Sequence, residues 1–165
     1  MGHHVLPTDA QTLLRHTIAT VAYRAGKVLR DAPADFADFR IGPATRTPVE
    51  ILTHMGDLFD WALTMAQDRT EWRTSDPQPW SAEVARFFDS LGSLDRHLAQ
   101  ASPLHSATIQ QMFQGPVADA LTHTGQLALL RRLAGQPVRG ESYAKADIEV
   151  GRTGIEQHAP RWEFD

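Results

Sequence analysis

Residues 47–65 read TPVEILTHMGDLFDWALTM, and this stretch carries the clearest helix signal in the chain. Thr47, Pro48 and Glu50 stand at the N-cap, first and third helical positions, which favour these residue types. Apolar residues then recur every three or four positions and predict one buried stripe, formed by Ile51, Met55, Leu58, Phe59, Ala62 and Met65. Gly56 inside this helix costs up to about 1 kcal/mol relative to Ala, which indicates either a closely packed neighbour or no special role.

Three further segments show the same periodicity and predict helices, at about residues 8–30, 81–101 and 115–135. Thr8 and Gln11 form a T-x-x-Q capping box at the start of the first of these. Gly115-Pro116 predicts the start of the last, because Pro is favoured in a first helical turn. A weaker signal favours a short helical piece at about residues 109–113.

Four helices of about 20 residues, each with one apolar stripe, predict an all-α four-helix bundle. No segment alternates apolar and polar residues as a half-buried strand does, so negligible sheet is expected. The connection between the first two helices is long enough to cross the bundle. A single domain is expected, with the bundle at about residues 8–135. Residues 136–165 predict an irregular extension laid over it, with one short helix at about residues 145–150.

The composition narrows the classes of function. A length of 165 residues is typical of one domain, and a formal charge of −4 argues against a nucleic-acid-binding surface. No stretch approaches the roughly 18 apolar residues of a membrane span. The N-terminal residues show no basic region followed by an apolar run, so a cytoplasmic location is expected. The chain has no Cys, which leaves imidazole and oxygen as the available metal ligands.

Polar side chains stand where the helical pattern expects buried ones. His54 follows Ile51 by three residues and therefore shares the buried face of its helix. Asp119 and His123 are four residues apart, so both lie on one face of the last helix. Three such groups can converge inside a bundle and hold a metal while leaving positions open for water or substrate. The alternative is a hydrogen-bonded core His and an Asp–His pair without a metal.

These two helices resemble the DinB-like superfamily of metalloenzymes, the DNA-damage-inducible and YfiT-like proteins. Its members share a Leu-x-His motif on the second helix, here Leu52-Thr53-His54, and a His-x-Gly-Gln motif on the last, here His123-Thr124-Gly125-Gln126. The resemblance covers about residues 8–135, and the order and helical placement of the motifs make it fairly specific.

The resemblance implies a four-helix bundle with a divalent metal bound by three side chains, here His54, Asp119 and His123. Asp119 departs from the family pattern, which has His at this position, yet a carboxylate is a suitable ligand for Zn, Ni, Fe or Mn. Characterised relatives use low-molecular-weight thiols such as mycothiol or bacillithiol. The resemblance therefore also implies a thiol cosubstrate, a small-molecule substrate and a homodimer. The formal charge of −4 argues against direct action on DNA.

Three hypotheses about function remain open. The first is a metal-dependent enzyme, either a thiol-dependent transferase or a hydrolase. In it Asp57 supports a ligand or acts as a general base, and Trp61 lines a pocket. Arg46 and Arg152 meet an anionic substrate. The alternatives for these residues are a surface or first-turn partner for Asp57, plain core packing for Trp61 and solvated charge for the two arginines.

The second hypothesis is a non-catalytic binding or stress-associated bundle whose metal site is weakened or lost, and the departure at Asp119 motivates it. The third is an association protein that uses one face of the bundle to form a dimer.

Overall fold

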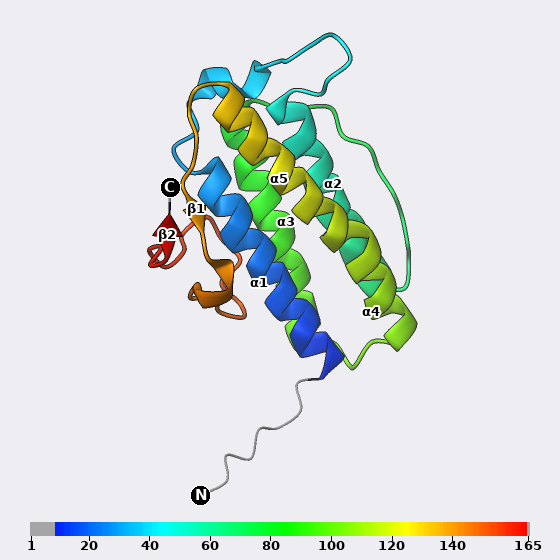
Figure 1. The fold of residues 1–165 in the computed structure, drawn as a ribbon. Coiled ribbons are helices and arrows are strands. Elements are labelled where there is room, and N and C mark those ends of the chain that lie inside the picture. Colours follow the sequence, from blue (N-terminus) through cyan, green and yellow to red (C-terminus); the bar gives the residue numbers. More distant parts are fainter. Residues whose placement is uncertain (1–8, 165) are drawn as a thin grey trace, which may run out of the picture.

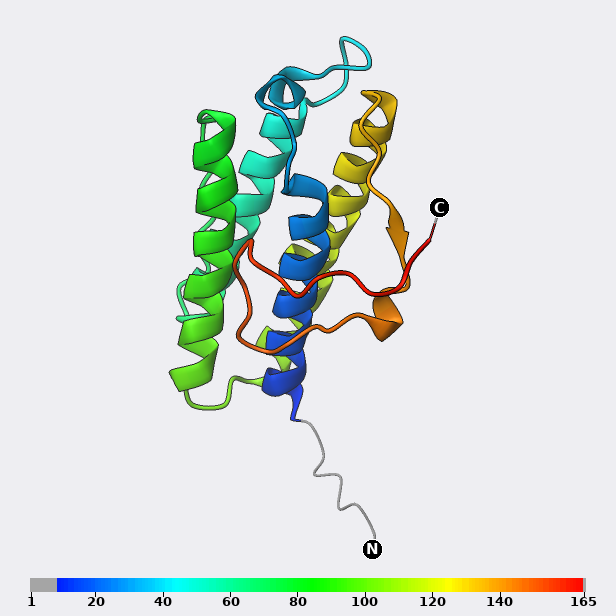
Figure 2. The same ribbon diagram turned by 90° about the vertical axis from the view of Figure 1, so that its left-hand side faces the viewer.

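The computed structural model describes residues 9–164. Within them the chain is mostly helical, and four long helices pack side by side around one apolar core (Figures 1 and 2). The helices are α1 (Ala10–Leu29), α2 (Pro48–Ala66), α3 (Trp80–Gln100), the short α4 (Ser106–Met112) and α5 (Ala118–Leu133). None of the helices between residues 9 and 164 combines the length and the apolar character of a membrane span.

The start of α2 is the one predicted from the sequence. Thr47 is the N-cap, Pro48 is the first helical residue, and Glu50 completes a capping box. The backbone N–H of Thr47 donates to a Glu50 carboxylate oxygen at 2.7 Å, and this hydrogen bond lowers the pKa of Glu50. The apolar stripe predicted for this helix is buried throughout.

The start of α1 differs from the prediction. Thr8, the predicted capping residue, lies outside the described residues. Asp9 is the N-cap instead, and its Oδ1 accepts a hydrogen bond from the backbone N–H of Thr12 at 2.7 Å. Gln11 is the second residue of α1, and its side-chain amide donates to the carbonyl of Leu98 at 2.8 Å. It therefore ties the start of α1 to the end of α3.

The predicted start of the last helix at Gly115-Pro116 is wrong. Residues 106–133 form one continuous helical segment in which a π-helical turn, Phe113–Val117, joins α4 to α5. Pro116 has no N–H to donate, and in a regular α-helix its ring would clash with the carbonyl four residues earlier. The wider π turn accommodates Pro116 and lets the helix continue. The end is as predicted, with Gly135 at a positive φ of 78°.

The C-terminal extension crosses over α1 (Figure 2). Its strands β1 (Gly140–Glu141) and β2 (Glu163–Phe164) form a two-residue antiparallel pair, a small addition to the expected absence of sheet. The short helix expected at about residues 145–150 is not formed, and a single 3₁₀ turn covers Tyr143–Lys145 instead. The extension therefore depends on contacts with α1 rather than on secondary structure of its own.

A buried polar cluster fastens this extension to α1. Lys27 donates to Glu141 at 2.9 Å and to Glu163 at 2.6 Å, and the Tyr23 hydroxyl donates to Glu141 at 2.7 Å. The side chain of Glu141 is fully buried and that of Lys27 is 9% exposed. Burial and the hydrogen bond to Glu141 raise the pKa of Tyr23, which therefore stays a neutral donor. A carboxylate this deep is tolerable only because both donors reach it.

Gly56 has the closely packed neighbour that its position in α2 suggested. A Cβ at this residue would lie 2.7 Å from Cζ of Arg86 on α3. The guanidinium passes over Gly56 to bind the backbone carbonyl of Thr53 at 2.7 Å and the carboxylates of Asp57 and Asp60 at 3.1 and 3.0 Å. The missing side chain at residue 56 thus lets α3 fasten itself to the backbone of α2.

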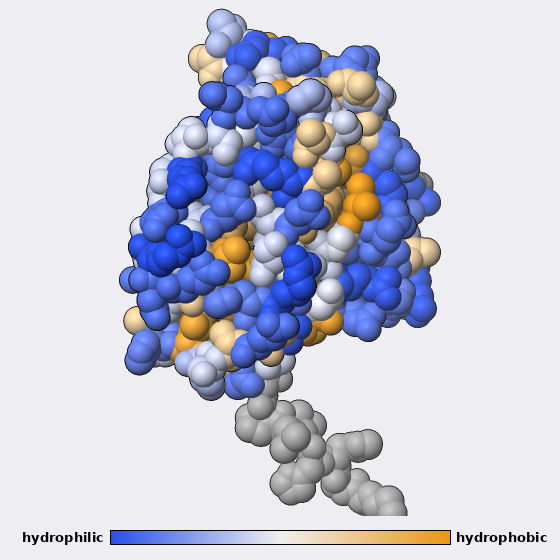
Figure 3. Space-filling view, turned by 180° about the vertical axis from the view of Figure 1, so that it is seen from behind, coloured by the Kyte–Doolittle hydropathy of each residue, from blue (hydrophilic) through white to orange (hydrophobic). Residues whose placement is uncertain are grey.

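The surface opposite the view of Figure 1 is largely hydrophilic (Figure 3). Apolar side chains on that face form small, separate groups rather than one extended patch. Large apolar patches mark stable interfaces between subunits. This face therefore offers no such surface, and the homodimer stays a prediction.

Gly56→Ala is expected to lower the free energy of unfolding by about 1 kcal/mol. The new Cβ would push the Arg86 guanidinium away from the Thr53 carbonyl and Asp57, and the lost hydrogen bonds outweigh the gain in helix propensity. Gly125→Ala in α5 is the matched control, because nothing lies within 4 Å of a Cβ there, and it should be neutral or stabilising. Chemical denaturation of both variants measures this. A Gly56→Ala protein as stable as the wild type would contradict the account.

Lys27→Met should cost about 3 kcal/mol, because it leaves the buried Glu141 carboxylate without its cation. Residues 140–164 should also become sensitive to limited proteolysis. Arg152→Met removes an exposed ion pair with Glu149 in the same extension and should change the stability by less than about 1 kcal/mol. Equal effects of the two substitutions would show that the buried cluster does not fasten the extension.

Candidate metal centre

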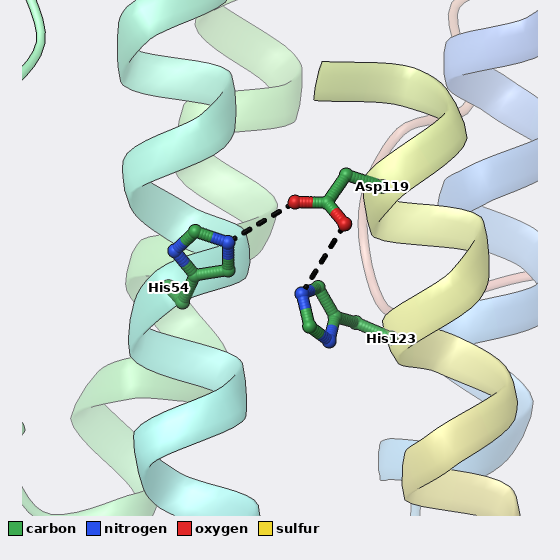
Figure 4. Close-up of side chains that lie close together, drawn as sticks. All are labelled: His54, Asp119 and His123. Atoms are coloured by element: carbon green, nitrogen blue, oxygen red, sulfur yellow. Dashed lines mark hydrogen bonds and ion pairs between the residues drawn. The ribbon is translucent and has the colours of Figure 1, made fainter. Parts of the chain in front are cut away.

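Three side chains from two neighbouring helices converge at one point, as the sequence predicted. His54 projects from α2, and Asp119 and His123 project from α5 (Figure 4). One potential ligand atom from each residue lies within 4.8 Å of the other two. Nε2 of His54 is 3.1 Å from one carboxylate oxygen of Asp119, and Nε2 of His123 is 3.4 Å from the other. The carboxylate therefore lies between the two imidazoles. We refer to His54, Asp119 and His123 as the metal group, because together they could hold a metal ion.

The group sits at the edge of the core rather than at its centre. The His123 side chain is 11% exposed, that of His54 is 25% exposed, and that of Asp119 is 43% exposed. The imidazole rings stand nearly perpendicular, with their centroids 5.0 Å apart. Solvent therefore reaches the group mainly on the Asp119 side, because the two imidazoles are the more buried side chains.

Gln126 fixes the orientation of the His123 ring. Its Oε1 lies 2.7 Å from Nδ1 of His123, one turn further along α5. The amide oxygen only accepts hydrogen bonds, so Nδ1 carries the proton and Nε2 of a neutral ring presents a lone pair. That lone pair points at Oδ1 of Asp119, which is also an acceptor.

Two acceptors that face each other need a cation between or beside them. A proton on His123 satisfies this need, and so does a metal ion bound by Nε2 and the carboxylate. A hydrogen bond from the outer ring nitrogen to an amide oxygen is also how metal-binding His residues are commonly held. The donor set of two imidazoles and one carboxylate therefore fits a divalent cation.

Trp72 covers the His54 side of the group, and the sequence analysis missed it. It lies in the segment between α2 and α3, with its ring centroid 5.7 Å from that of His54. Its indole N–H donates to the hydroxyl of Thr74 at 3.1 Å. The only signal for this role is an aromatic residue in an otherwise polar segment, and no periodicity places that segment against α2.

Trp61 lies behind Trp72, with their ring centroids 5.6 Å apart. A Cβ at Gly115 would be 3.6 Å from the Trp61 ring, so the π turn packs against it. Trp61 also lines a polar cavity of about 490 Å³ that includes Asp57. His54, Asp119 and His123 are not among the residues that line this cavity, so the pocket-lining role predicted for Trp61 concerns a different site.

Asp57 is not among the side chains that converge. It is buried, and its two carboxylate oxygens accept hydrogen bonds from the backbone N–H of Ser75 at 3.0 Å and from Arg86 at 3.1 Å. Asp57 thus secures the segment that carries Trp72 and the contact with α3. Its proposed part as a general base stays a prediction.

The two arginines considered for substrate binding lie in different places. Arg152 pairs with Glu149 in the C-terminal extension at 3.2 Å, on the exposed surface. Arg46 lines an open pocket of about 380 Å³, and His123 and Gln126 form part of the wall of the same pocket. Arg46 is thus the one that shares a cavity with the metal group.

No family model, curated protein or solved structure matches the chain. The resemblance to the DinB-like superfamily therefore rests on the motifs of α2 and α5 alone.

Proposed function

We propose that the chain is a metal-dependent enzyme with a four-helix bundle of the DinB-like type, in which His54, Asp119 and His123 hold one divalent cation. The observation that carries the proposal is the convergence of one ligand atom from each of the three residues within 4.8 Å, with Nδ1 of His123 held by Gln126. Two imidazoles and one carboxylate suit Zn, Ni, Fe or Mn and leave coordination positions for other ligands.

A divalent cation at this position supplies Lewis acidity, which lowers the pKa of a coordinated thiol or water. The chain has no Cys, so a thiol used here arrives with a cosubstrate. Asp119 brings one negative charge between the imidazoles and lies on the solvent side, where a reactant enters. Trp72 packs against the His54 ring. These features support a thiol-dependent transferase or a hydrolase that acts on a small molecule.

A second function, a non-catalytic bundle without metal, is favoured by one specific observation. Asp119 already pairs with both imidazoles at 3.1 and 3.4 Å. With one or both rings protonated, the three side chains satisfy one another. The metal content of the protein decides between the two functions.

The purified protein is expected to bind about one divalent cation per chain after reconstitution with Zn, Ni, Mn or Fe. Asp119→Ala and His123→Ala should each lose it, whereas Asp119→His should retain it because imidazole is an equally suitable ligand. Asp89→Ala and His16→Ala change exposed residues of the same types on other helices and serve as controls. Elemental analysis after dialysis measures the content. Wild-type protein without bound metal under all four conditions would overturn the proposal.

Gln126→Leu should weaken metal binding by about 10–100-fold, the usual effect of removing a partner that orients a metal-binding His. Thr122→Ala is the control, because this exposed neighbour of His123 bonds only to the carbonyl of Ala118. Competition with a chromophoric chelator gives the two affinities, and thermal melts check folding. Unchanged affinity in Gln126→Leu would mean that the amide does not set the direction of the His123 lone pair.

A further inference from the structure

The pocket beside His123 combines an apolar wall with one cationic side chain. It lies between the segment that precedes α2, the first turns of α2 and residues 123–130 of α5. Its apolar side chains are Ile41, Ile51, Leu129 and Leu130. Ile41 and Leu129 are each 54% exposed, although both are large aliphatic residues. Such side chains around a cavity of about 380 Å³ are typical of a site for a small ligand with an apolar part.

Arg46 is the cation of this pocket. Within residues 9–164 its guanidinium forms no hydrogen bond or ion pair. Glu50 is the nearby carboxylate, but its Oε2 already accepts from the backbone of Thr47 at 2.7 Å and lies 3.5 Å from Arg40. The charge of Arg46 contributes to the lowered pKa of Glu50, but it does so without a direct contact, so the N–H groups of the guanidinium can still bind an oxyanion.

The polar residues on the α5 side of the pocket include His123, which also belongs to the metal group. Gln126 and His123 both belong to the wall, and the Nε2 atom of His123 faces Asp119. A ligand held by Arg46 would therefore lie with one end against the residues that hold the cation. A guanidinium binds carboxylates and phosphates through paired N–H groups, and it repels cationic ligands.

We propose that this pocket binds the substrate of the protein and that the substrate is an amphipathic oxyanion, with a carboxylate or phosphate on Arg46 and a hydrocarbon part against Ile51 and Leu130. This proposal rests on the function proposed above, because the bound molecule is a substrate only if the protein is an enzyme. The contact with Arg46 itself requires no metal. Recognition of the anion and binding of the cation are therefore separable.

Isothermal titration of the full chain with hexanoate, hexyl phosphate and hexylamine tests the proposal. Hexanoate or hexyl phosphate should bind, and whichever binds more tightly identifies the oxyanion. Acetate should bind more weakly, because it lacks the hydrocarbon part. Arg46→Gln should weaken binding of the preferred anion by at least about 10-fold, as expected for the loss of a charge-assisted hydrogen bond. Arg96→Gln, on the exposed face of α3, is the control and should bind normally. Thermal melts confirm that both variants fold.

The titrations are run on metal-free protein, prepared by chelation and dialysis, and again after addition of Zn²⁺. Binding that depends on Arg46 in a protein that takes up no metal would leave the pocket standing and overturn the enzyme proposal. Metal uptake without binding of either anion would overturn the anion pocket and leave the enzyme proposal standing. Equal binding of hexylamine, or unchanged binding in Arg46→Gln, would overturn the assignment of an anion pocket.

Discussion

The reciprocal hydrogen bonds between Thr47 and Glu50 fix where α2 begins, and much of the molecule follows from that register. Seven residues after the cap, His54 faces α5 and meets Asp119. Two residues further, Gly56 opens the space that Arg86 of α3 needs. A shift of α2 by one residue would turn both positions by about 100° around the helix. The capping box thus determines both the direction in which His54 points and the place where Arg86 of α3 contacts α2.

The parts of the molecule that sequence patterns predicted are those governed by local spacing. The cap of α2 is a four-residue pattern, and the approach of Asp119 to His123 follows from a separation of four residues on a helix. His54 lies opposite Asp119 and His123 because the apolar stripes of α2 and α5 face the same core. The difference at Pro116 between the predicted and the observed start of the last helix also has a local cause. Pro is favoured at a helix start, but neighbouring packing can retain it inside a helix by widening one turn.

The parts that could not be predicted depend on contacts between residues far apart in the chain. Lys27 and Glu141 are separated by 114 positions, and nothing near either residue indicates that they form a buried pair. Trp72 lies in a segment without periodicity, and its place against His54 follows from tertiary contacts that include the hydrogen bond from Ser75 to Asp57. Gln126 was visible as part of a motif, but its hydrogen bond to His123 required the geometry of the folded helix.

The two sides of the metal group differ in their surroundings: aromatic rings pack on the His54 side, and a pocket lies on the His123 side. On the His54 flank, Trp72 lies against the imidazole, and Trp61 lies behind it. On the His123 flank, the wall opens into the pocket that holds Arg46, while Asp119 is nearly half exposed between them. For the proposed enzyme, a substrate held by Arg46 would therefore reach the metal-binding residues from the His123 side. The single carboxylate suits an anionic substrate, because a divalent cation bound by Asp119 and two neutral imidazoles would carry a net charge of +1 and attract an anion.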